Sequence, residues 1–384
     1  MKILVALTYY HPHWTGLTKV ARHVAEGMAA RGHEVTVLTS RFRSDLAPHE
    51  VLNGVRVVRL PVLARVSRGT LMPTFPWVAA RLVRSHEVVQ IHTPMLEAPY
   101  LTSLARAVGI RSVITHHGDL VMPSGVFDQT VERFVTALLR RALRQADRAV
   151  VYTRDYLEHS PFLAPFAAKC VPIWPPVAAA EPDFAAARSW RVELGLDRQR
   201  LVGFAGRFVE EKGFDFLLKA VPLLARDVPD VRFVYAGERN VVYEGFFEHC
   251  RPLLERAEPH VIFLGLLREP QRLANFYAMC DVIAVPSRTD NLPLVPLEAM
   301  LCGTPAVVAD IPGARMVIRR GNMGRLVPPG DGRALAEGLR EVLLERSRFV
   351  KPRAEVEALF DLRGSLDEYE CALTEFPRRG VPAA

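Results

Sequence analysis

The fold is decided by residues 281–305, which read DVIAVPSRTDNLPLVPLEAMLCGTP. The first five residues form a short apolar run that is typical of a buried parallel strand, and residues 297–301 have the composition of a helix that ends at Gly303. A strand followed directly by a helix is the repeating unit of a doubly wound α/β sheet. We therefore expect a parallel sheet with a ligand site at the carboxyl end of this strand.

Two carboxylates, Asp290 and Glu298, lie on either side of the start of this predicted helix. The backbone N–H groups around Leu294 and Val295 would face a phosphate or a sugar hydroxyl at the edge of the sheet. Carboxylates accept hydrogen bonds from vicinal hydroxyls, so the stretch suits a polyhydroxylated, anionic ligand. The alternative interpretation is that Asp290 is a solvated turn residue and Glu298 a helix-start carboxylate stabilised by the helix dipole.

A second stretch, residues 203–213, reads GFAGRFVEEKG and also joins a predicted strand to a predicted helix. A ligand with phosphate groups carries negative charge, and fixed cations nearby would stabilise that charge. Arg207 can bind two phosphate oxygens with its guanidinium, and Lys212 can place a compact charge beside them. The alternative is that the Lys-Gly pair at this helix start is only a solvated turn.

These two stretches resemble the signatures of the retaining glycosyltransferases of family 4, nucleotide-sugar enzymes with the GT-B fold of two facing Rossmann-like domains. The resemblance covers most of the chain. It implies that Asp290 holds the donor sugar's hydroxyls, that Glu298 holds the ribose, and that Arg207 and Lys212 bind the phosphates. The chain departs from the family pattern in one place, where the shorter Asp290 replaces a glutamate and Asn291 replaces the usual Gly or Ser.

The resemblance also assigns residues in the first half of the chain. A histidine at the position of His117 lies close to the donor sugar in family members, so His117, Arg207, Lys212 and Asp290 are the expected catalytic residues. The expected donor-binding residues are Gly16, Gly206, Gly237, Leu294, Val295 and Glu298. The expected acceptor-binding residues are His13, Trp14 and Asp119, and the alternative for the first two is that they only pack their loop.

Strands and helices alternate in both halves of the sequence, which implies parallel pairing with right-handed crossovers. The expected strands are residues 3–7, 34–39, 88–92, 112–115, 149–152, 201–205, 231–236, 261–264, 281–285 and 306–309. The expected helices of the second half begin near Phe214, Tyr243, Pro270 and Leu294, and the last begins after Gly332.

The same alternation, at a length of 384 residues, predicts two domains of ordinary size. We expect a Rossmann-like, acceptor-binding domain over residues 1–177 and a Rossmann-like, donor-binding domain over residues 178–354. The proline-rich residues 172–177 are the predicted connector. The tail, residues 355–384, has apolar residues at helical spacing, and the resemblance implies that it returns to the first domain.

Composition narrows the class of protein. With 49% hydrophobic and 24% charged residues the chain is typical of a globular protein. The five cysteines are widely scattered, which argues against both a disulfide framework and a zinc site. No apolar run approaches the ~18 residues needed to span a bilayer, and the N-terminus has the pattern of a first strand and not of a signal peptide. We expect a cytoplasmic protein.

The net charge of +7 is unevenly distributed. Residues 1–178 contain 21 Lys and Arg against 12 Asp and Glu. Basic residues flank an aromatic stretch at 71–77 (Arg65, Arg68, Arg81, Arg84) and crowd a predicted helix (Arg133, Arg140, Arg141, Arg144, Arg148). Such surfaces can dock on an anionic membrane, here the inner face, or can be solvated helix faces. Nucleic acid is not an expected partner, because no recognised binding motif accompanies the charge.

The combined prediction is metal-independent transfer of a sugar, with retention of anomeric configuration, from a nucleoside diphosphate sugar to a hydroxyl of a glycan or lipid-linked acceptor. No Asp-x-Asp pair supplies a metal site, and no other cofactor is expected. A bacterial cell-envelope or exopolysaccharide glycan is the expected acceptor class. Two alternatives share the fold: a sugar-nucleotide epimerase, and a noncatalytic nucleotide-sugar-binding protein. A nicotinamide dehydrogenase fits poorly, because the loop after the first strand lacks its glycine pattern.

Overall fold

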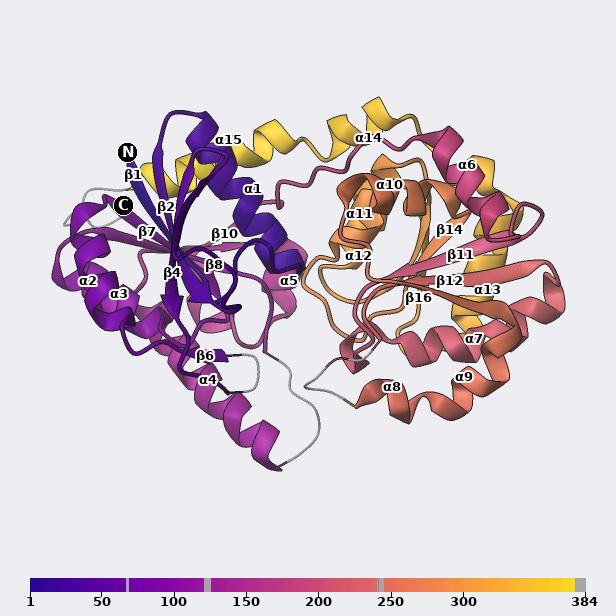
Figure 1. Cartoon of the computed structure of the whole chain (residues 1–384), viewed down its shortest axis with the longest axis horizontal. Coiled ribbons are helices and arrows are strands. Elements are labelled where there is room, and N and C mark those ends of the chain that lie inside the picture. Colours follow the sequence, from indigo (N-terminus) through magenta and orange to yellow (C-terminus); the bar gives the residue numbers. More distant parts are fainter. Residues whose placement is uncertain (67–68, 121–125, 240, 242–244, 377–384) are drawn as a thin grey trace. The chain divides into compact units, whose positions relative to one another are not determined.

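The structure of the protein is a computed structural model, and it describes residues 1–66, 69–120, 126–239, 241 and 245–376 (Figure 1). The chain folds into two compact units. The first comprises Met1–Pro176 and the segment that begins at Leu362, and the second comprises Val177–Asp361. The expected helix start at Tyr243 and the basic residue Arg68 lie outside the described residues.

The first unit is built on a sheet whose strands are parallel, except for an antiparallel edge pair. Its interior strands are buried along almost their whole length, as parallel strands between helices are, and buried polar residues in them bond to each other, as Gln90 does to Thr115. In spatial order the strands are β10 (Cys170–Pro172), β9 (Arg148–Val151), β8 (Arg111–His116), β7 (Val88–Thr93), β1 (Lys2–Ala6), β2 (Glu34–Arg41), β4 (Val55–Pro61) and β3 (His49–Leu52).

The antiparallel edge pair and a small hairpin are additions to the expected alternation. A tight turn at Asn53 and Gly54 joins β3 to β4, and both residues have positive φ, 47° and 81°. An Asn-Gly pair favours this conformation because neither residue resists φ > 0 strongly. The small hairpin pairs β5 (Ala64–Val66) with β6 (Gly69–Leu71).

Helices cover the sheet of the first unit. They are α1 (Gly16–Ala30), α2 (Phe75–Ser85), α3 (Ala98–Ala107), α4 (Val126–Gln145), α5 (Arg154–His159) and α15 (Leu362–Thr374). The C-terminal helix α15 packs on α1 at Gly27, where a Cβ atom would come within 2.6 Å of Leu366 Cδ2. Ion pairs from Arg31 to Asp367 and Glu370 hold the same contact. The expected tail helix is therefore divided, because α14 (Arg353–Leu359) remains in the second unit.

The second unit contains an entirely parallel sheet. Its strands follow the expected positions, with one further strand at the edge. In spatial order they are β13 (Val261–Gly265), β12 (Val231–Ala236), β11 (Arg200–Ala205), β14 (Val282–Val285), β15 (Ala306–Ala309) and β16 (Gly324–Val327).

Helices also cover the second sheet. They are α6 (Phe184–Glu193), α7 (Phe214–Asp227), α8 (Phe246–His249), α9 (Arg251–Ala257), α10 (Pro270–Met279), α11 (Leu294–Leu301), α12 (Arg315–Gly321) and α13 (Gly332–Leu344). Phe208 and Phe214, from the loop and helix that follow β11, are buried in the core of this unit. Their ring centroids lie 4.2 Å apart.

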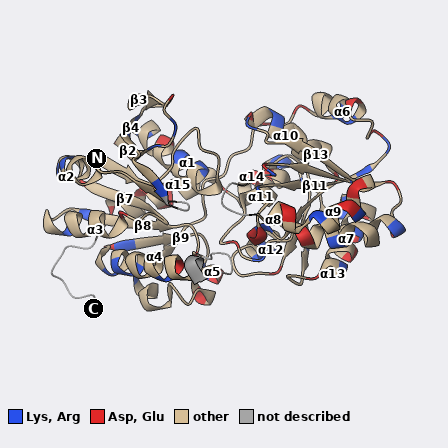
Figure 2. Cartoon of the chain, turned by 60° about the horizontal axis from the view of Figure 1, so that its bottom comes forward, with Lys and Arg blue, Asp and Glu red and all other residues tan. Residues whose placement is uncertain are grey.

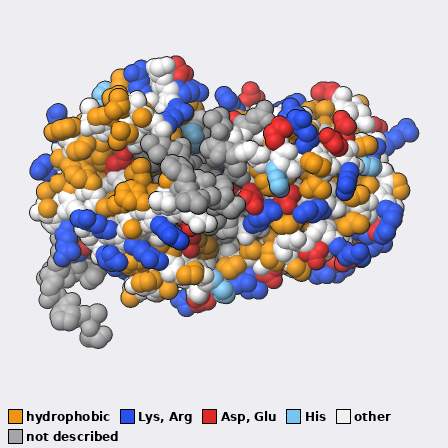
Figure 3. Space-filling view, turned by 90° about the horizontal axis from the view of Figure 1, so that it is seen from below, with side chains coloured by type: hydrophobic (Ala, Val, Ile, Leu, Met, Phe, Trp, Pro, Cys, Tyr) orange, Lys and Arg blue, Asp and Glu red, His pale blue; other side chains and the backbone are white. Residues whose placement is uncertain are grey.

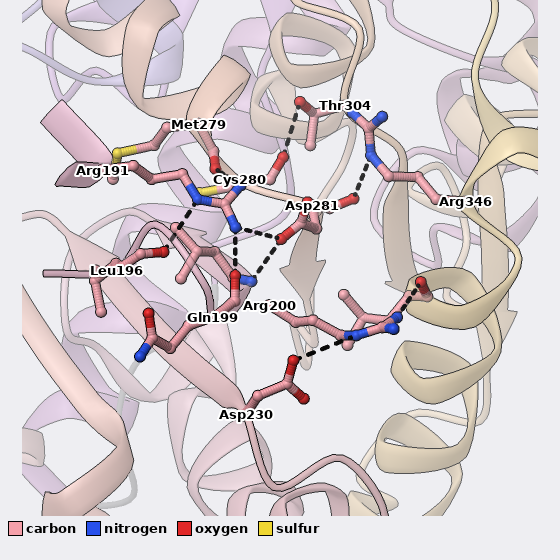
Figure 4. A network of polar contacts seen from close by, with 12 residues as sticks. Arg191, Leu196, Gln199, Arg200, Asp230, Met279, Cys280, Asp281, Thr304 and Arg346 are labelled. Carbon is pink, nitrogen blue, oxygen red and sulfur yellow. Dashed lines mark hydrogen bonds and ion pairs between the residues drawn. The ribbon is translucent and has the colours of Figure 1, made fainter. Parts of the chain in front are cut away.

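A polar network ties the amino end of the second sheet together (Figure 4). The carboxylate of Asp281, the residue before β14, accepts hydrogen bonds from the Leu201 N–H at 2.7 Å and from Arg191 at 3.3 Å. Arg346 donates to the Asp281 carbonyl oxygen at 3.2 Å. Because these contacts satisfy the amino end of the sheet, the loops at the opposite, carboxyl edge are the ones left to bind a ligand.

Strand order determines which loops meet at that carboxyl edge. In the second unit β11 lies between β12 and β14, so the loops that begin at Gly206, Gly237 and Pro286 are neighbours. In the first unit β7 lies between β1 and β8, and this brings the loops that contain His13 and His117 to one edge. Where the strand order reverses, neighbouring loops leave a crevice, and doubly wound sheets bind their ligands in such a crevice.

Candidate active site

Gly237, in the loop after β12, packs directly against the backbone of Gly206, in the loop after β11. A Cβ atom on Gly237 would lie 1.8 Å from the carbonyl oxygen of Gly206. That oxygen also accepts a hydrogen bond from the Tyr235 hydroxyl at 2.7 Å. No residue with a side chain fits at Gly237 without moving this backbone. The two loops therefore form one fixed edge, from which Arg207 follows directly.

Lys212 closes a short 3₁₀ turn, Glu210–Lys212, in front of helix α7. The turn is continued by Gly213 at φ 65°, where a Cβ atom would meet the Pro286 carbonyl oxygen at 2.0 Å. The Lys212 ammonium lies 2.6 Å from Asp290 Oδ2 and 3.9 Å from Glu211. Burial opposes the charged form, but the two carboxylates together raise the pKa of Lys212. Lys212 is therefore a fixed cation at this edge.

Arg207 provides the second cation of the same edge. Its guanidinium lies 3.3 Å from Glu211 Oε1, the carboxylate that also faces Lys212. The two cations are thus adjacent, each balanced by a carboxylate and each partly exposed. A diphosphate could replace these carboxylates as the counter-charge, because its oxygens suit both a guanidinium and an ammonium group.

Glu298 lies in α11, and only 4% of its surface is exposed. The Tyr277 hydroxyl donates a hydrogen bond to its Oε2 at 3.0 Å. Burial, and then the Glu298 carboxylate, raise the pKa of Tyr277 well above its usual range, so the hydroxyl stays protonated and remains a donor. Glu298 is in the second turn of the helix, since α11 begins at Leu294. The alternative view of Glu298 as a helix-start carboxylate is therefore wrong.

The start of α11 leaves backbone donors for a ligand. Pro293 occupies the N-cap position, and its side chain has no oxygen that could cap the helix. The N–H groups of Leu294 and Val295, which are half-buried, are therefore available to an anion.

In the first unit His117 follows β8 and is held on both ring nitrogens. Its Nε2 lies 2.7 Å from Nδ1 of His92, and its Nδ1 lies 2.5 Å from the Tyr152 hydroxyl. Burial, followed by the neighbouring His92 and His116, lowers the pKa of His117 well below its usual range. His117 is therefore a neutral imidazole with a fixed ring orientation.

Asp119 belongs to a network beside His117. Its carboxylate lies 3.0 Å from Nε2 of His116 and accepts a hydrogen bond from the Ser160 hydroxyl at 2.8 Å. Burial raises the pKa of Asp119, but the His116 and Ser160 contacts outweigh it and the pKa is lowered. Asp119 is thus an ionised carboxylate that organises the loop after β8.

The loop after β1 is fixed at both of its ends. Thr15 caps α1 in a reciprocal pair with Thr18, directly before Gly16. The Thr18 hydroxyl also donates to the His13 carbonyl oxygen at 2.6 Å. The His13 ring stacks on Tyr9 with centroids 4.5 Å apart, while Trp14 keeps 36% of its surface exposed. Trp14 is therefore the most exposed residue of this loop.

Comparison with known proteins decides the family. The model of the glycosyl transferases group 1 matches residues 199–345, and the model of the glycosyl transferase 4-like domain matches residues 15–175. The GDP-mannose-dependent alpha-(1-6)-phosphatidylinositol monomannoside mannosyltransferase of Mycolicibacterium smegmatis is 31% identical over 340 residues, 84% of each chain. The chain belongs to the group 1 glycosyltransferases. It is an enzyme of the GT-B type that uses a nucleotide sugar, and the predicted family and fold class are confirmed.

Solved structures show the same fold for this glycosyltransferase. The sucrose-phosphate synthase of Thermosynechococcus elongatus matches with a TM-score of 0.77 at 19% identity, over 97% of this chain and 98% of the other. HepE from Anabaena, solved in complex with UDP-glucose, matches with a TM-score of 0.75 at 19% identity, over 97% and 100% of the two chains. Among the described residues of the glycosyltransferase, the helices lack a segment both long and apolar enough to cross a membrane.

The second unit of the glycosyltransferase brings most of its predicted donor residues to one edge. Gly206, Arg207, Lys212 and Asp290 are linked there by direct contacts or adjacent loops, and Gly237 packs against them. Trp14 lies in the loop after β1, whereas His117 follows β8 in the same unit. Their roles toward a ligand stay predictions.

Sequence reasoning missed the residues that hold the predicted ones in place. Tyr277 orients Glu298, and His92 and Tyr152 orient His117. The second group was detectable: His92 and Tyr152 both lie at the carboxyl ends of expected strands, and parallel alignment of those strands places them beside His117. Tyr277 gives no such signal, because it lies in a helix 21 positions before Glu298.

Proposed function

We propose that this glycosyltransferase transfers a hexose from a nucleoside diphosphate sugar to a hydroxyl acceptor, with retention of anomeric configuration and without a metal ion. The proposal depends on one observation, the pair of fixed cations Arg207 and Lys212. Both lie in the segment after β11, and the ion pair between Lys212 and Asp290 joins this segment to the loop that leads into α11. Cations fixed where a diphosphate departs perform the charge stabilisation that a divalent metal would otherwise supply.

In the proposed reaction the bond between the anomeric carbon and the diphosphate oxygen breaks as the acceptor oxygen bonds to the same face of that carbon. The acceptor proton passes to the departing phosphate. Positive charge develops on the sugar and negative charge on the diphosphate. Arg207 and Lys212 stabilise the diphosphate, the N–H groups at the start of α11 contribute further donors, and Glu298 accepts hydrogen bonds from the ribose.

A neutral His117 suits this transition state. An imidazolium beside a sugar that gains positive charge would raise the barrier, whereas a neutral ring adds no opposing charge there. Its lowered pKa supports the neutral form at physiological pH. Asp290 forms an ion pair with Lys212, so we assign it no nucleophilic role. It keeps the ammonium in place, and when the bound diphosphate becomes the partner of Lys212, the Asp290 carboxylate accepts a hydrogen bond from a sugar hydroxyl.

We further propose a lipid-linked or glycan acceptor of the cell envelope, reached at an anionic membrane surface on the cytoplasmic side. The relatives named for phosphatidylinositol acceptors support this class of acceptor. In the first unit Arg133, Arg140, Arg141 and Arg144 of α4 are exposed, and Figure 2 shows basic residues along this helix. Part of this face, together with Glu132, lines a hollow of about 450 Å³. Arg148 does not belong to this face, because it binds carbonyl oxygens at the end of α15.

Apolar side chains accompany these arginines. Phe134 on α4 is 62% exposed and Trp77 on α2 is 73% exposed. Figure 3 shows hydrophobic side chains interspersed with Lys and Arg on the face of the first unit seen from below. Binding to an anionic bilayer combines apolar side chains that enter the interface with cations that are attracted to the lipid headgroups. The exposed aromatic rings and the arginines could supply these two contributions.

The test is a donor and acceptor screen with the purified protein. We expect release of UDP or GDP from one member of a panel of UDP- and GDP-hexoses in the presence of phosphatidylinositol vesicles, unaffected by EDTA. NMR of the product should show the anomeric configuration of the donor. Release of diphosphate from no donor, with binding retained, would favour a noncatalytic binding protein, and conversion of the donor without any acceptor would favour an epimerase.

A further inference from the structure

The turn that carries Lys212 rests on the segment after β14. The N–H of Arg288 donates to the Glu211 carbonyl oxygen at 2.8 Å, and Gly213 packs against the Pro286 carbonyl. This segment continues to Asp290, which binds the Lys212 ammonium. The position of Lys212 thus depends on how firmly the two segments are joined.

The Arg288 side chain provides that join. Its two terminal nitrogens bind the two carboxylate oxygens of Asp215 at 2.7 Å and 2.9 Å, and one of them also donates to the Glu210 carbonyl oxygen at 2.9 Å. The Arg288 guanidinium also lies 4.1 Å from the ring centroid of Phe216. A paired fork of this kind fixes orientation as well as distance.

Asp215 anchors the guanidinium to the first turn of α7. Its side chain is only 9% exposed, and Lys219 gives it a second cation at 3.3 Å. The terminal nitrogens of Arg288 are engaged with Asp215 and the Glu210 carbonyl, so the side chain is directed at the protein and not at a phosphate. Its chemistry is that of a support for the turn.

We propose that Arg288 and Asp215 are positioning residues for Lys212, holding its ammonium at the place of the departing diphosphate. The proposal rests on the function proposed above. Lys212 carries one compact charge on a flexible chain, so its effect depends on the placement of its backbone. A shift of about 1 Å in such a group can lower a rate by about 100-fold.

The test uses the full chain with Arg288→Met and Asp215→Asn, the second being isosteric and less prone to misfold. The matched control is Arg325→Met, which breaks another Arg–carboxylate pair of the same unit, to Glu341 at 2.7 Å. Three quantities are measured: the acetylation rate of Lys212 relative to Lys351 in the same molecule by peptide mass spectrometry, the Kd for UDP and GDP by calorimetry, and the binding of uridine and guanosine by saturation-transfer NMR.

We expect Lys212 to be acetylated several-fold faster relative to Lys351 in both variants, the diphosphate Kd to rise about tenfold, and nucleoside binding to stay unchanged. A merely structural role would weaken diphosphate and nucleoside alike. An unchanged acetylation ratio in folded Asp215→Asn and Arg288→Met overturns the proposal. A wild-type protein that binds neither UDP nor GDP contradicts the proposed function instead, and the acetylation ratio still decides the positioning role.

Discussion

At the scale of single residues, the Tyr277 hydroxyl is the group whose loss should weaken nucleotide binding with the least disturbance. In Tyr277→Phe the buried Glu298 carboxylate loses its donor at 3.0 Å. We expect a cost of about 1–2 kcal/mol in binding free energy, roughly a tenfold rise in the Kd for UDP or GDP by calorimetry. The control is Tyr369→Phe, which removes a buried hydroxyl with no partner in the described part of the chain. Equal Kd values for Tyr277→Phe and wild type would show that Glu298 needs no such support.

Lys212 is the residue on which turnover should depend most. We expect Lys212→Met to lower kcat by about 10³-fold, because a fixed charge that faces the transition state is lost. The measurement is initial rate with the donor found in the screen, alongside thermal unfolding. Lys351→Met serves as the control, since Lys351 forms an ion pair with Glu355, four residues along the chain, at 2.6 Å. A kcat within threefold of wild type would remove Lys212 from the catalytic residues.

At the scale of elements, the contact between α1 and α15 should make the first unit sensitive to acid. The hydrogen bond from His33 lowers the pKa of Glu370; burial acts in the opposite direction, but the contacts from Arg31 add to the effect of His33 and the pKa is lowered overall. A carboxyl whose pKa is lower in the folded state contributes stability above its unfolded pKa, and this contribution disappears as the pH falls through the folded pKa. Glu370→Gln should therefore be less stable than wild type at pH 7, and the difference should shrink as the pH is lowered from 7 to 3.

Urea unfolding of wild type and Glu370→Gln across that pH range measures this effect. The neighbouring Glu368→Gln is the control, because Glu368 is exposed on the same helix. A difference between wild type and Glu370→Gln that stays constant from pH 7 to pH 3 would contradict the linkage to Glu370.

Helix α4 should determine binding to membranes. Replacement of Arg140, Arg141 and Arg144 by Gln removes three exposed cations, each worth about 1 kcal/mol near an anionic surface, so affinity should fall roughly 100-fold. Flotation with phosphatidylglycerol vesicles at low salt measures it. The control replaces three exposed arginines of the second unit, Arg188, Arg198 and Arg226. Equal flotation of both triple variants would mean that α4 is a solvated face.

The elements that the sequence predicted well share one physical property. The interior parallel strands are buried on both faces and rich in Val and Ile, and such stretches stand out in a sequence. The edge elements lack that signal: β3 alternates between exposed and half-buried residues, and β16 is only partly buried. The Asn53-Gly54 turn was a usable sign of the β3–β4 hairpin.

The candidate site divides in the same way. The places of Arg207 and Lys212 could be predicted because they lie in the loop after a recognisable strand, and that of Glu298 because it lies in the helix after β14. Arg288 and Tyr277 could not be predicted, because their partners Asp215 and Glu298 are distant in sequence and the pairs form only when the strands assemble. Local patterns identify candidate ligand-binding groups, whereas the residues that hold these groups in place follow from tertiary packing.

At the scale of the whole molecule, the two units differ in how the chain builds them. The second unit is one continuous segment, Val177–Asp361, with a core of its own, whereas the first needs α15 from the far end of the chain. A continuous segment with its own core is expected to fold alone. We therefore expect a fragment of residues 177–361 to unfold cooperatively and to bind UDP or GDP with a Kd within about threefold of the full chain.

The same fragment should transfer no sugar, because His117 and the predicted acceptor residues belong to the first unit. Calorimetry and circular dichroism of the fragment test the binding and the folding, and the donor screen tests the transfer.

The companion fragment, residues 1–176, should be less stable than the same segment mixed with an α15 peptide, since α15 covers α1 at Gly27 and supplies both partners of Arg31. A fragment 177–361 that folds but binds no nucleoside diphosphate, while the full chain does, would move the donor site out of the second unit.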